Sequence, residues 1–130
     1  DGLIDAAIDA AANVPSPQTE IFIASLGGAA SRPAVDSAAY PHRDATFVMN
    51  VHGRWDSASE DARGVRWART FFDATAPFAN GGVYVNFMTD DETSRVKNAY
   101  GANYDRLVDI KTAVDPANRF RPAQGIRPRT

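Results

Sequence analysis

The chain has 130 residues, with 14 Lys and Arg against 16 Asp and Glu and a formal net charge of -2. This length suits one domain with a real core, and the charge balance argues against a nucleic-acid binder. Because the chain has no cysteine, disulfides, thiolate metal sites and a cysteine nucleophile are excluded within it. No apolar run approaches the length of a membrane span, and the N-terminus lacks a signal-peptide pattern, so we expect a soluble chain.

The first half of the chain alternates between regular and irregular patterns. Residues 3–12 carry an apolar stripe that predicts a short amphipathic helix, and "TEIFIASLGG" (19–28) predicts a strand that ends at two glycines. Residues 29–44 contain two prolines and no period, which is typical of a loop. "ATFVMNVHGRWD" (45–56) keeps a period of two and predicts the clearest strand.

A helix is predicted next, over residues 56–78. Ser57 and Glu60 have the spacing of a capping box at its start. Its apolar face is expected to hold Val65, Trp67, Ala68, Phe71 and Phe72.

The last third begins with a short run of β-formers. "VYVNF" (83–87) predicts a third strand. Asp90, Asp91 and Glu92 then suit the N-terminal end of the following helix, where the helix dipole stabilises negative charge. Residues 92–115 are predicted to be helical, with a break at Gly101. The buried stripe of this helical stretch is expected to hold Tyr104, Leu107, Val108 and Val114.

These elements predict an α+β fold, with a mostly antiparallel sheet and helices on one face. The chain starts almost directly in a helix and ends in a tail rich in Pro and Arg. We therefore expect it to be a piece of a larger protein.

Polar side chains share a face on two of the predicted strands. Asn50 and His52 are two residues apart, as are Tyr84 and Asn86, and a spacing of two places each pair on one face of a strand. The face that carries them either meets water or lines a pocket. Tyr and Asn together supply donors and acceptors without charge, which suit an uncharged organic ligand.

The two histidines permit different interpretations. His52 is a possible general base, since its intrinsic pKa lies near neutrality, or it is an ordinary hydrogen-bonded side chain. His42, in "YPHRD", is expected to anchor its loop. Together with Asp44 the histidines match no known metal-ligand spacing, so no metal site is predicted. Neither double glycine belongs to a dinucleotide or phosphate-loop motif.

A set of residues in the last third resembles the C-terminal signature of the berberine-bridge-enzyme-like FAD-linked oxidases. "YVNF" is followed by "AYGANYDRLVDIKTAVDPANRFRPAQGIRP". The matching residues are Tyr84, Asn86, Phe87, Tyr100, Gly101, Asn103, Tyr104, Arg106, Leu107, Asp115, Pro116, Asn118, Phe120, Ile126 and Pro128. Upstream, "LGGAASR", "YPHRD" and "RW…WAR" also resemble that family, so the likeness covers roughly residues 20–130.

The resemblance implies an enzyme larger than this chain. Members oxidise small organic substrates by hydride transfer to FAD, which is held by an N-terminal domain that is missing here. Residues 1–82 would be the C-terminal part of the substrate-binding domain, and residues 83–130 the berberine-bridge-type C-terminal segment, together one compact unit. Tyr84, Asn86, Asn50 and His52 would line the flavin or its substrate. The chain alone is expected to be inactive and not to hold FAD.

One position departs from the family pattern. In many members the aromatic residue after the asparagine is a tyrosine that acts as, or assists, the general base. Here it is Phe87, which cannot take a proton. The base would then be His52, Tyr84 or a residue outside this chain.

Two other functions compete with the oxidase. One is a stand-alone ferredoxin-like α+β module for ligand binding or dimerisation, and the other is a small cofactor-free monooxygenase that would use Asn50 and His52. Neither explains the tail motif. If the chain is an oxidase portion, its partner is the FAD-binding domain, and the docking surface around Tyr100, Tyr104 and Phe120 would be bare and favour homodimers.

Overall fold

The computed structural model describes residues 2–122 and 124–129 and shows an α+β chain. It divides into two compact units, which we describe separately. Unit 1 comprises Asp1–Ser25 and Phe47–Asn80, and unit 2 comprises Leu26–Thr46 and Gly81–Thr130.

Unit 1 is built on an antiparallel pair of strands, β1 (Glu20–Ser25) and β2 (Phe47–His52). Both strands confirm the prediction from the sequence. The register places Glu20 opposite His52. Just before β1, Thr19 fixes this register, because its hydroxyl donates to the Arg54 carbonyl at 3.1 Å and accepts from the Arg54 amide at 3.2 Å.

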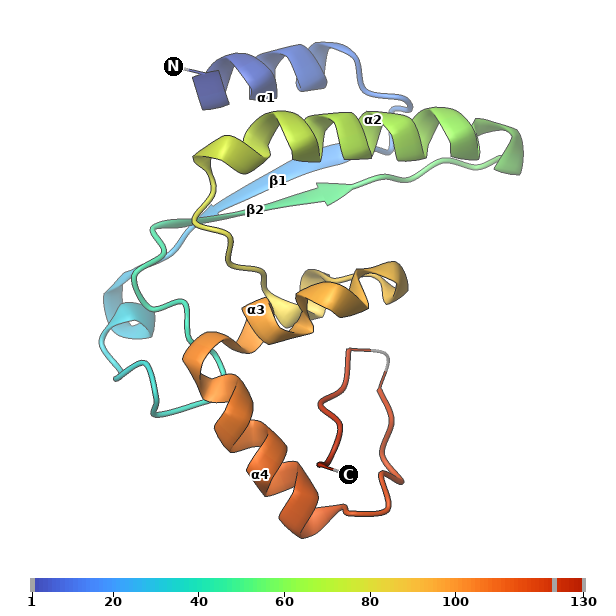
Figure 1. Cartoon of the computed structure of the whole chain (residues 1–130). Helices are drawn as coiled ribbons and strands as arrows, with labels where there is room; N and C mark the ends of the chain where they lie inside the picture. Colours follow the sequence, from blue (N-terminus) through green and yellow to red (C-terminus); the bar gives the residue numbers. More distant parts are fainter. Residues whose placement is uncertain (1, 123, 130) are drawn as a thin grey trace. The chain divides into compact units, whose positions relative to one another are not determined.

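The helices of unit 1 are α1 (Gly2–Ala12) and α2 (Asp61–Thr75), and Figure 1 shows both on the same side of the two strands. They are joined by the Trp67 indole, which donates to the Ala10 carbonyl at 3.1 Å. Phe71 is 2% exposed, and its ring stacks on the Trp67 ring with centroids 6.0 Å apart.

Two details of α2 differ from the prediction. Val65 and Phe72 are 39% and 48% exposed, because the helix turns Gly64, Phe71 and Thr75 inward instead. No capping box forms at the predicted position: the Ser57 side chain accepts from the Ser59 amide at 3.3 Å and caps a 3₁₀ turn, Ala58–Glu60, that precedes α2.

In unit 2 the prediction of a third strand, at residues 83–87, is wrong. Residues 85–87 form a 3₁₀ turn, closed by the Phe87 amide on the Tyr84 carbonyl at 2.8 Å. Val83 and Val85 turn toward a small core of Met88, Val96 and Ala99. Within the described residues both strands belong to unit 1, so the segment has no ladder to join and its β propensity is overridden.

The predicted helical stretch is interrupted as expected. It comprises α3 (Val96–Tyr100), a 3₁₀ turn (Gly101–Asn103) and α4 (Tyr104–Val114), and Gly101 has a φ of 50°, which favours glycine. Val108 is buried, whereas Val114 is 75% exposed, contrary to prediction, because it is the last residue of α4.

The acidic cluster occupies the predicted position before α3. A 3₁₀ helix spans Asp90–Arg95, and Thr89 and Glu92 form a reciprocal capping box at its start. Burial raises the pKa of Glu92, but hydrogen bonds from Thr89 and Arg95 outweigh it and hold that pKa below its usual value.

Candidate functional site

Part of the C-terminal motif forms hydrogen bonds to the loop at residues 35–38 of unit 2. The Asn103 side-chain amide donates to the Val35 carbonyl at 2.8 Å and to the Ala38 carbonyl at 3.0 Å. One turn along α4, the Arg106 guanidinium donates to the Asp36 carbonyl at 2.9 Å. These two motif residues therefore hold residues 35–38 in place.

A second part of the motif turns the tail. The Asp115 carboxylate accepts from the amides of Arg119 at 2.8 Å and Phe120 at 3.0 Å, and from the Lys111 ammonium at 2.5 Å. The Lys111 hydrogen bond, with those amides, lowers the pKa of Asp115 to about 2. Asn118 takes a φ of 48°, a left-handed conformation that asparagine tolerates better than most residues.

Tyr84 and Asn86 come together, although by a turn and not by a strand. The Asn86 side-chain amide donates to the Tyr84 hydroxyl oxygen at 2.7 Å. Because that oxygen serves as the acceptor, the Tyr84 O–H remains a donor for another group. The Phe87 ring meets the Tyr84 ring edge-on, with centroids 5.0 Å apart.

The "YPHRD" loop also contacts this aromatic group. His42 bonds through Nε2 to the Val83 carbonyl at 3.1 Å, as expected for an anchoring residue. The Tyr40 ring lies edge-on to the Tyr84 ring at 5.9 Å, and the Arg43 guanidinium lies 5.0 Å from the Tyr40 ring centroid. Tyr84 is thus positioned by a segment some forty residues upstream.

A cavity of about 350 Å³ lies beside the turn in unit 2. It is lined by Val85, Asn86, Met88, Tyr100, Pro122 and Gln124. Burial raises the pKa of the Tyr100 phenol, so this side chain stays a neutral donor at physiological pH. Asn86 thus lies at a cavity that mixes apolar walls with uncharged polar groups, as organic ligands require.

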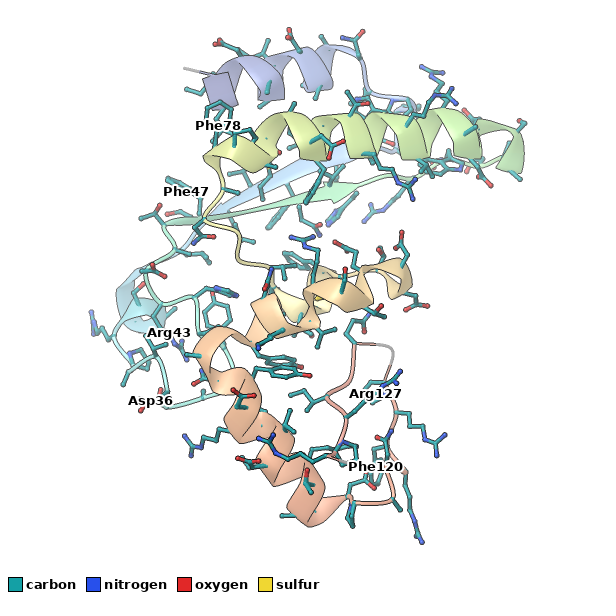
Figure 2. The ribbon with its side chains drawn as sticks, in the orientation of Figure 1. Asp36, Arg43, Phe47, Phe78, Phe120 and Arg127 are labelled. Atoms are coloured by element: carbon teal, nitrogen blue, oxygen red, sulfur yellow. The ribbon has the colours of Figure 1, made fainter. Side chains whose placement is uncertain are left out.

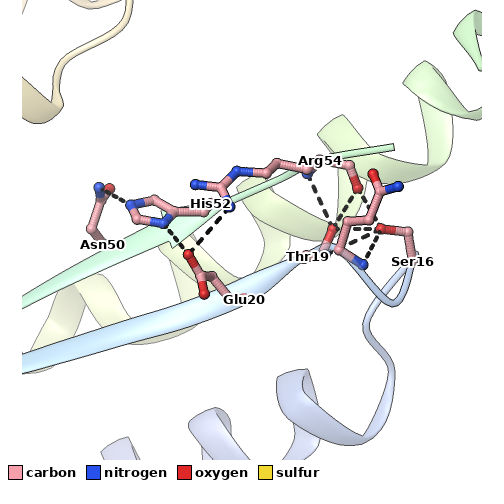
Figure 3. A network of polar contacts seen from close by, with 7 residues as sticks. Ser16, Thr19, Glu20, Asn50, His52 and Arg54 are labelled. Atoms are coloured by element: carbon pink, nitrogen blue, oxygen red, sulfur yellow. Dashed lines mark hydrogen bonds and ion pairs between the residues drawn. The ribbon is translucent and has the colours of Figure 1, made fainter. Parts of the chain in front are cut away.

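The other predicted pair lies in unit 1, on one face of the strands (Figure 3). The Asn50 amide nitrogen lies 2.7 Å from His52 Nε2, and His52 Nδ1 lies 2.6 Å from Glu20 Oε1. The Phe22 ring stacks on the imidazole at 6.1 Å between centroids. The hydrogen bond from His52 is the main cause that holds the pKa of Glu20 below its usual value, and Arg54, 3.5 Å away, adds to it.

Glu20 and Phe22 were missed by reasoning from the sequence. Both precede His52 by thirty residues or more and belong to the other strand, so only the register brings them to the imidazole. The available signal was their alternation in "TEIFIAS", which places them on one face of β1. Asn50 and His52 themselves lie in unit 1, and Tyr84 and Asn86 in unit 2.

Two general features are absent from the part of the chain that the structure describes. There, no three histidine or carboxylate side chains converge as metal ligands would. Nor does any described helix combine the length and apolar character needed to cross a bilayer.

Residues 83–127 match the family described as "Berberine and berberine like". Over 116 residues the chain is 33% identical to an uncharacterized FAD-linked oxidoreductase, YgaK, of Bacillus subtilis (strain 168), covering 89% of this chain and 26% of that protein. Berberine bridge enzyme-like 24 of Arabidopsis thaliana is 30% identical over 121 residues, which cover 78% of this chain and 22% of that protein.

A solved structure of a berberine bridge enzyme variant shares the fold. The TM-score is 0.71 at 23% identity, over 88% of this chain and 28% of that one. The chain spans about a quarter of the length of the curated relatives it matches. From its C-terminal motif and from these matches, the chain is a relative of the berberine bridge enzyme-like FAD-linked oxidoreductases.

Proposed function

We propose that this chain is the C-terminal portion of an FAD-dependent oxidoreductase that oxidises a small organic substrate by hydride transfer to flavin. The observation that carries this proposal is the family match over residues 83–127, within which Tyr84 and Asn86 form a hydrogen-bonded pair. The FAD-binding domain of the same enzyme would be its partner.

The described residues fit one part of FAD. The flavin ring presents uncharged carbonyl and N–H groups at its edge. Tyr84, Asn86 and Asn50 supply uncharged donors and acceptors, and His52 adds its ring nitrogens. The diphosphate needs a different environment, and neither double glycine of the chain forms a phosphate loop. These four residues would therefore line the ring or its substrate, while the phosphates would be held by the FAD-binding domain.

When bound, FAD supplies the hydride acceptor. In this chain Tyr84 would orient a polar group through its free O–H, because Asn86 already occupies one lone pair of its oxygen. Phe87 stands where relatives often have a tyrosine base and supplies only its ring. The proton would leave the substrate through His52, Tyr84 or a residue outside the chain.

The first experiment adds FAD to the purified chain, removes the excess by gel filtration and records the visible spectrum. We expect no retained flavin bands, because the proposed partner domain supplies the diphosphate site. Flavin retained at one per chain would contradict the proposal that the partner domain is needed to hold FAD. The chain would then be a flavoprotein on its own.

A second experiment probes the ring-lining residues directly. Lumiflavin, the flavin ring without ribityl phosphate, is titrated into ¹⁵N-labelled chain, and side-chain amide and imidazole shifts are followed by NMR. We expect shifts at Asn86 and a loss of response in Asn86→Ala, while the exposed Asn98 and its variant Asn98→Ala serve as the control. No response at Asn50, His52, Tyr84 and Asn86 alike would refute the proposed lining.

A further inference from the structure

We infer that Glu20 is a positioning residue, which holds His52 with its Nε2 lone pair ready to accept a proton from a substrate hydroxyl. This inference deepens the proposed function and rests on it. It names a residue, an atom and a substrate class: an organic compound that is oxidised at a carbon bearing a hydroxyl group.

The hydrogen bonds around His52 determine which ring nitrogen carries the proton. The Asn50 Oδ1 accepts from the Val51 amide at 3.0 Å, so the NH₂ end of the same side chain must face His52. An NH₂ group only donates, and Nε2 must therefore be the acceptor. The proton then resides on Nδ1 and is donated to the Glu20 carboxylate at 2.6 Å.

The surroundings of the imidazole favour this arrangement. Glu20 faces His52 across the ladder, so the two side chains meet without any distortion of the strands. Phe22 stacks on the ring at an interplanar angle of 9° and fixes its plane. The nearby charges are those of Glu20 and Arg54, which are themselves paired at 3.5 Å. The His52 side chain remains 28% exposed, which leaves a ligand access to it.

A substrate hydroxyl that replaces the Asn50 amide would donate its hydrogen bond to the same lone pair. In the complete enzyme, bound FAD would supply the acceptor for the hydride of the C–H bond. On the side of this chain, the O–H bond would break and its electron pair would form the C=O bond. The proton passes to Nε2. The resulting imidazolium is stabilised by the Glu20 carboxylate, in the way that a carboxylate supports a catalytic histidine elsewhere.

The chain contains its own reference for a test. It has two histidines, and His42 bonds through Nε2 to the Val83 carbonyl, which only accepts. Long-range ¹H–¹⁵N NMR of the labelled chain above the titration range of histidine distinguishes the two neutral tautomers. We expect His52 to carry its proton on Nδ1 and His42 to carry its proton on Nε2.

Three variants separate the role of Glu20 from general stability. In Glu20→Ala, Nδ1 loses its acceptor, so the fraction of His52 that carries its proton on Nδ1 should fall, because the Asn50 donor alone then favours that tautomer. Glu20→Gln should restore it, since the amide oxygen still accepts from Nδ1. Glu60→Ala, which removes another carboxylate of unit 1, should leave both histidines unchanged.

The acceptor role is probed with 4-methylphenol, a simple hydroxyl donor. Titration should shift the Nε2 resonance of His52 and the side-chain amide of Asn50, and leave His42 in place. A proton on Nε2 of His52 in the wild-type chain, an unchanged tautomer in Glu20→Ala, failure of Glu20→Gln to restore it, or no shift with the phenol would each overturn the inference. None of these measurements uses flavin, so their failure is distinguishable from failure of the flavin proposal.

Discussion

Asn103 is 6% exposed, and its side chain makes its hydrogen bonds to carbonyls 68 and 65 residues earlier in the chain. Asn103→Ala would leave the Val35 and Ala38 carbonyls without this donor. We expect the free energy of unfolding in urea to fall by about 1–3 kcal/mol, the usual net contribution of two intramolecular hydrogen bonds. Asn98→Ala, at an exposed position of α3, is the matched control, and an equal loss there would contradict the assignment.

Asp115 gives the chain a pH dependence whose sign follows from its lowered pKa. The pKa in the folded chain is about 2, against an ordinary 3.8, so the contribution of the carboxylate to stability is complete above about pH 4 and is lost as the pH falls through 2. We therefore expect Asp115→Asn to be less stable than the wild type at pH 5.

The difference between wild type and Asp115→Asn should shrink progressively below pH 4 and vanish as the pH falls below 2. Urea unfolding at several pH values measures it, with Asp73→Asn, exposed on α2, as the control. A difference that stays constant from pH 5 to pH 2 would show that the ion pair with Lys111 and the amide bonds do not stabilise the turn.

At the scale of elements, Thr89 caps the 3₁₀ helix Asp90–Arg95 of unit 2. Its side chain accepts from the amide of Glu92, whose carboxylate accepts in return from the Thr89 amide at 3.0 Å. Thr89→Ala should lower the free energy of unfolding by about 1 kcal/mol, the typical effect of losing an N-cap. Thr93→Ala, inside the same 3₁₀ helix, keeps the cap and should cost less.

Elements with a strong period of their own were predicted well from the sequence. The alternation in 45–56 and the stripe in 3–12 were sufficient, because each reports which face of one element is apolar. The prediction of a strand at residues 83–87 failed because the described part of unit 2 offers no strand for them to pair with. The packing of Val83 and Val85 against the core of unit 2 therefore determines their conformation.

The candidate site was predictable only where its residues are close in sequence. Asn50 with His52, and Tyr84 with Asn86, are each two residues apart, and each pair is hydrogen-bonded. Glu20 joins His52 through the strand register. No spacing in the sequence reveals that register until β1 and β2 are aligned.

At the scale of the whole molecule, the surface around Tyr100, Tyr104 and Phe120 is exposed only in part. Tyr100 and Tyr104 are partly buried and pack against the core of unit 2. Phe120, labelled in Figure 2, is 76% exposed. Unit 1 also exposes apolar side chains, among them Ile8 at 60% and Phe47 at 65%.

We therefore expect concentration-dependent self-association of the isolated chain, since apolar surface of this extent favours contact. Phe120→Ser should weaken it, as measured by sedimentation velocity over a range of concentrations. Arg119→Ser removes the neighbouring exposed side chain without removing an aromatic ring and serves as the control. A wild-type chain that stays monomeric at high concentration would contradict the expectation.

The interleaving of the two units has a consequence for how the chain is made. The chain passes from one unit to the other after Ser25, after Thr46 and after Asn80. On the ribosome, unit 1 has all its residues once Asn80 has emerged, whereas residues 35–38 must wait for Asn103 and Arg106, which hold them. Synthesis from the N-terminus thus imposes an order, in which the strand pair of unit 1 can assemble before this loop is held in place.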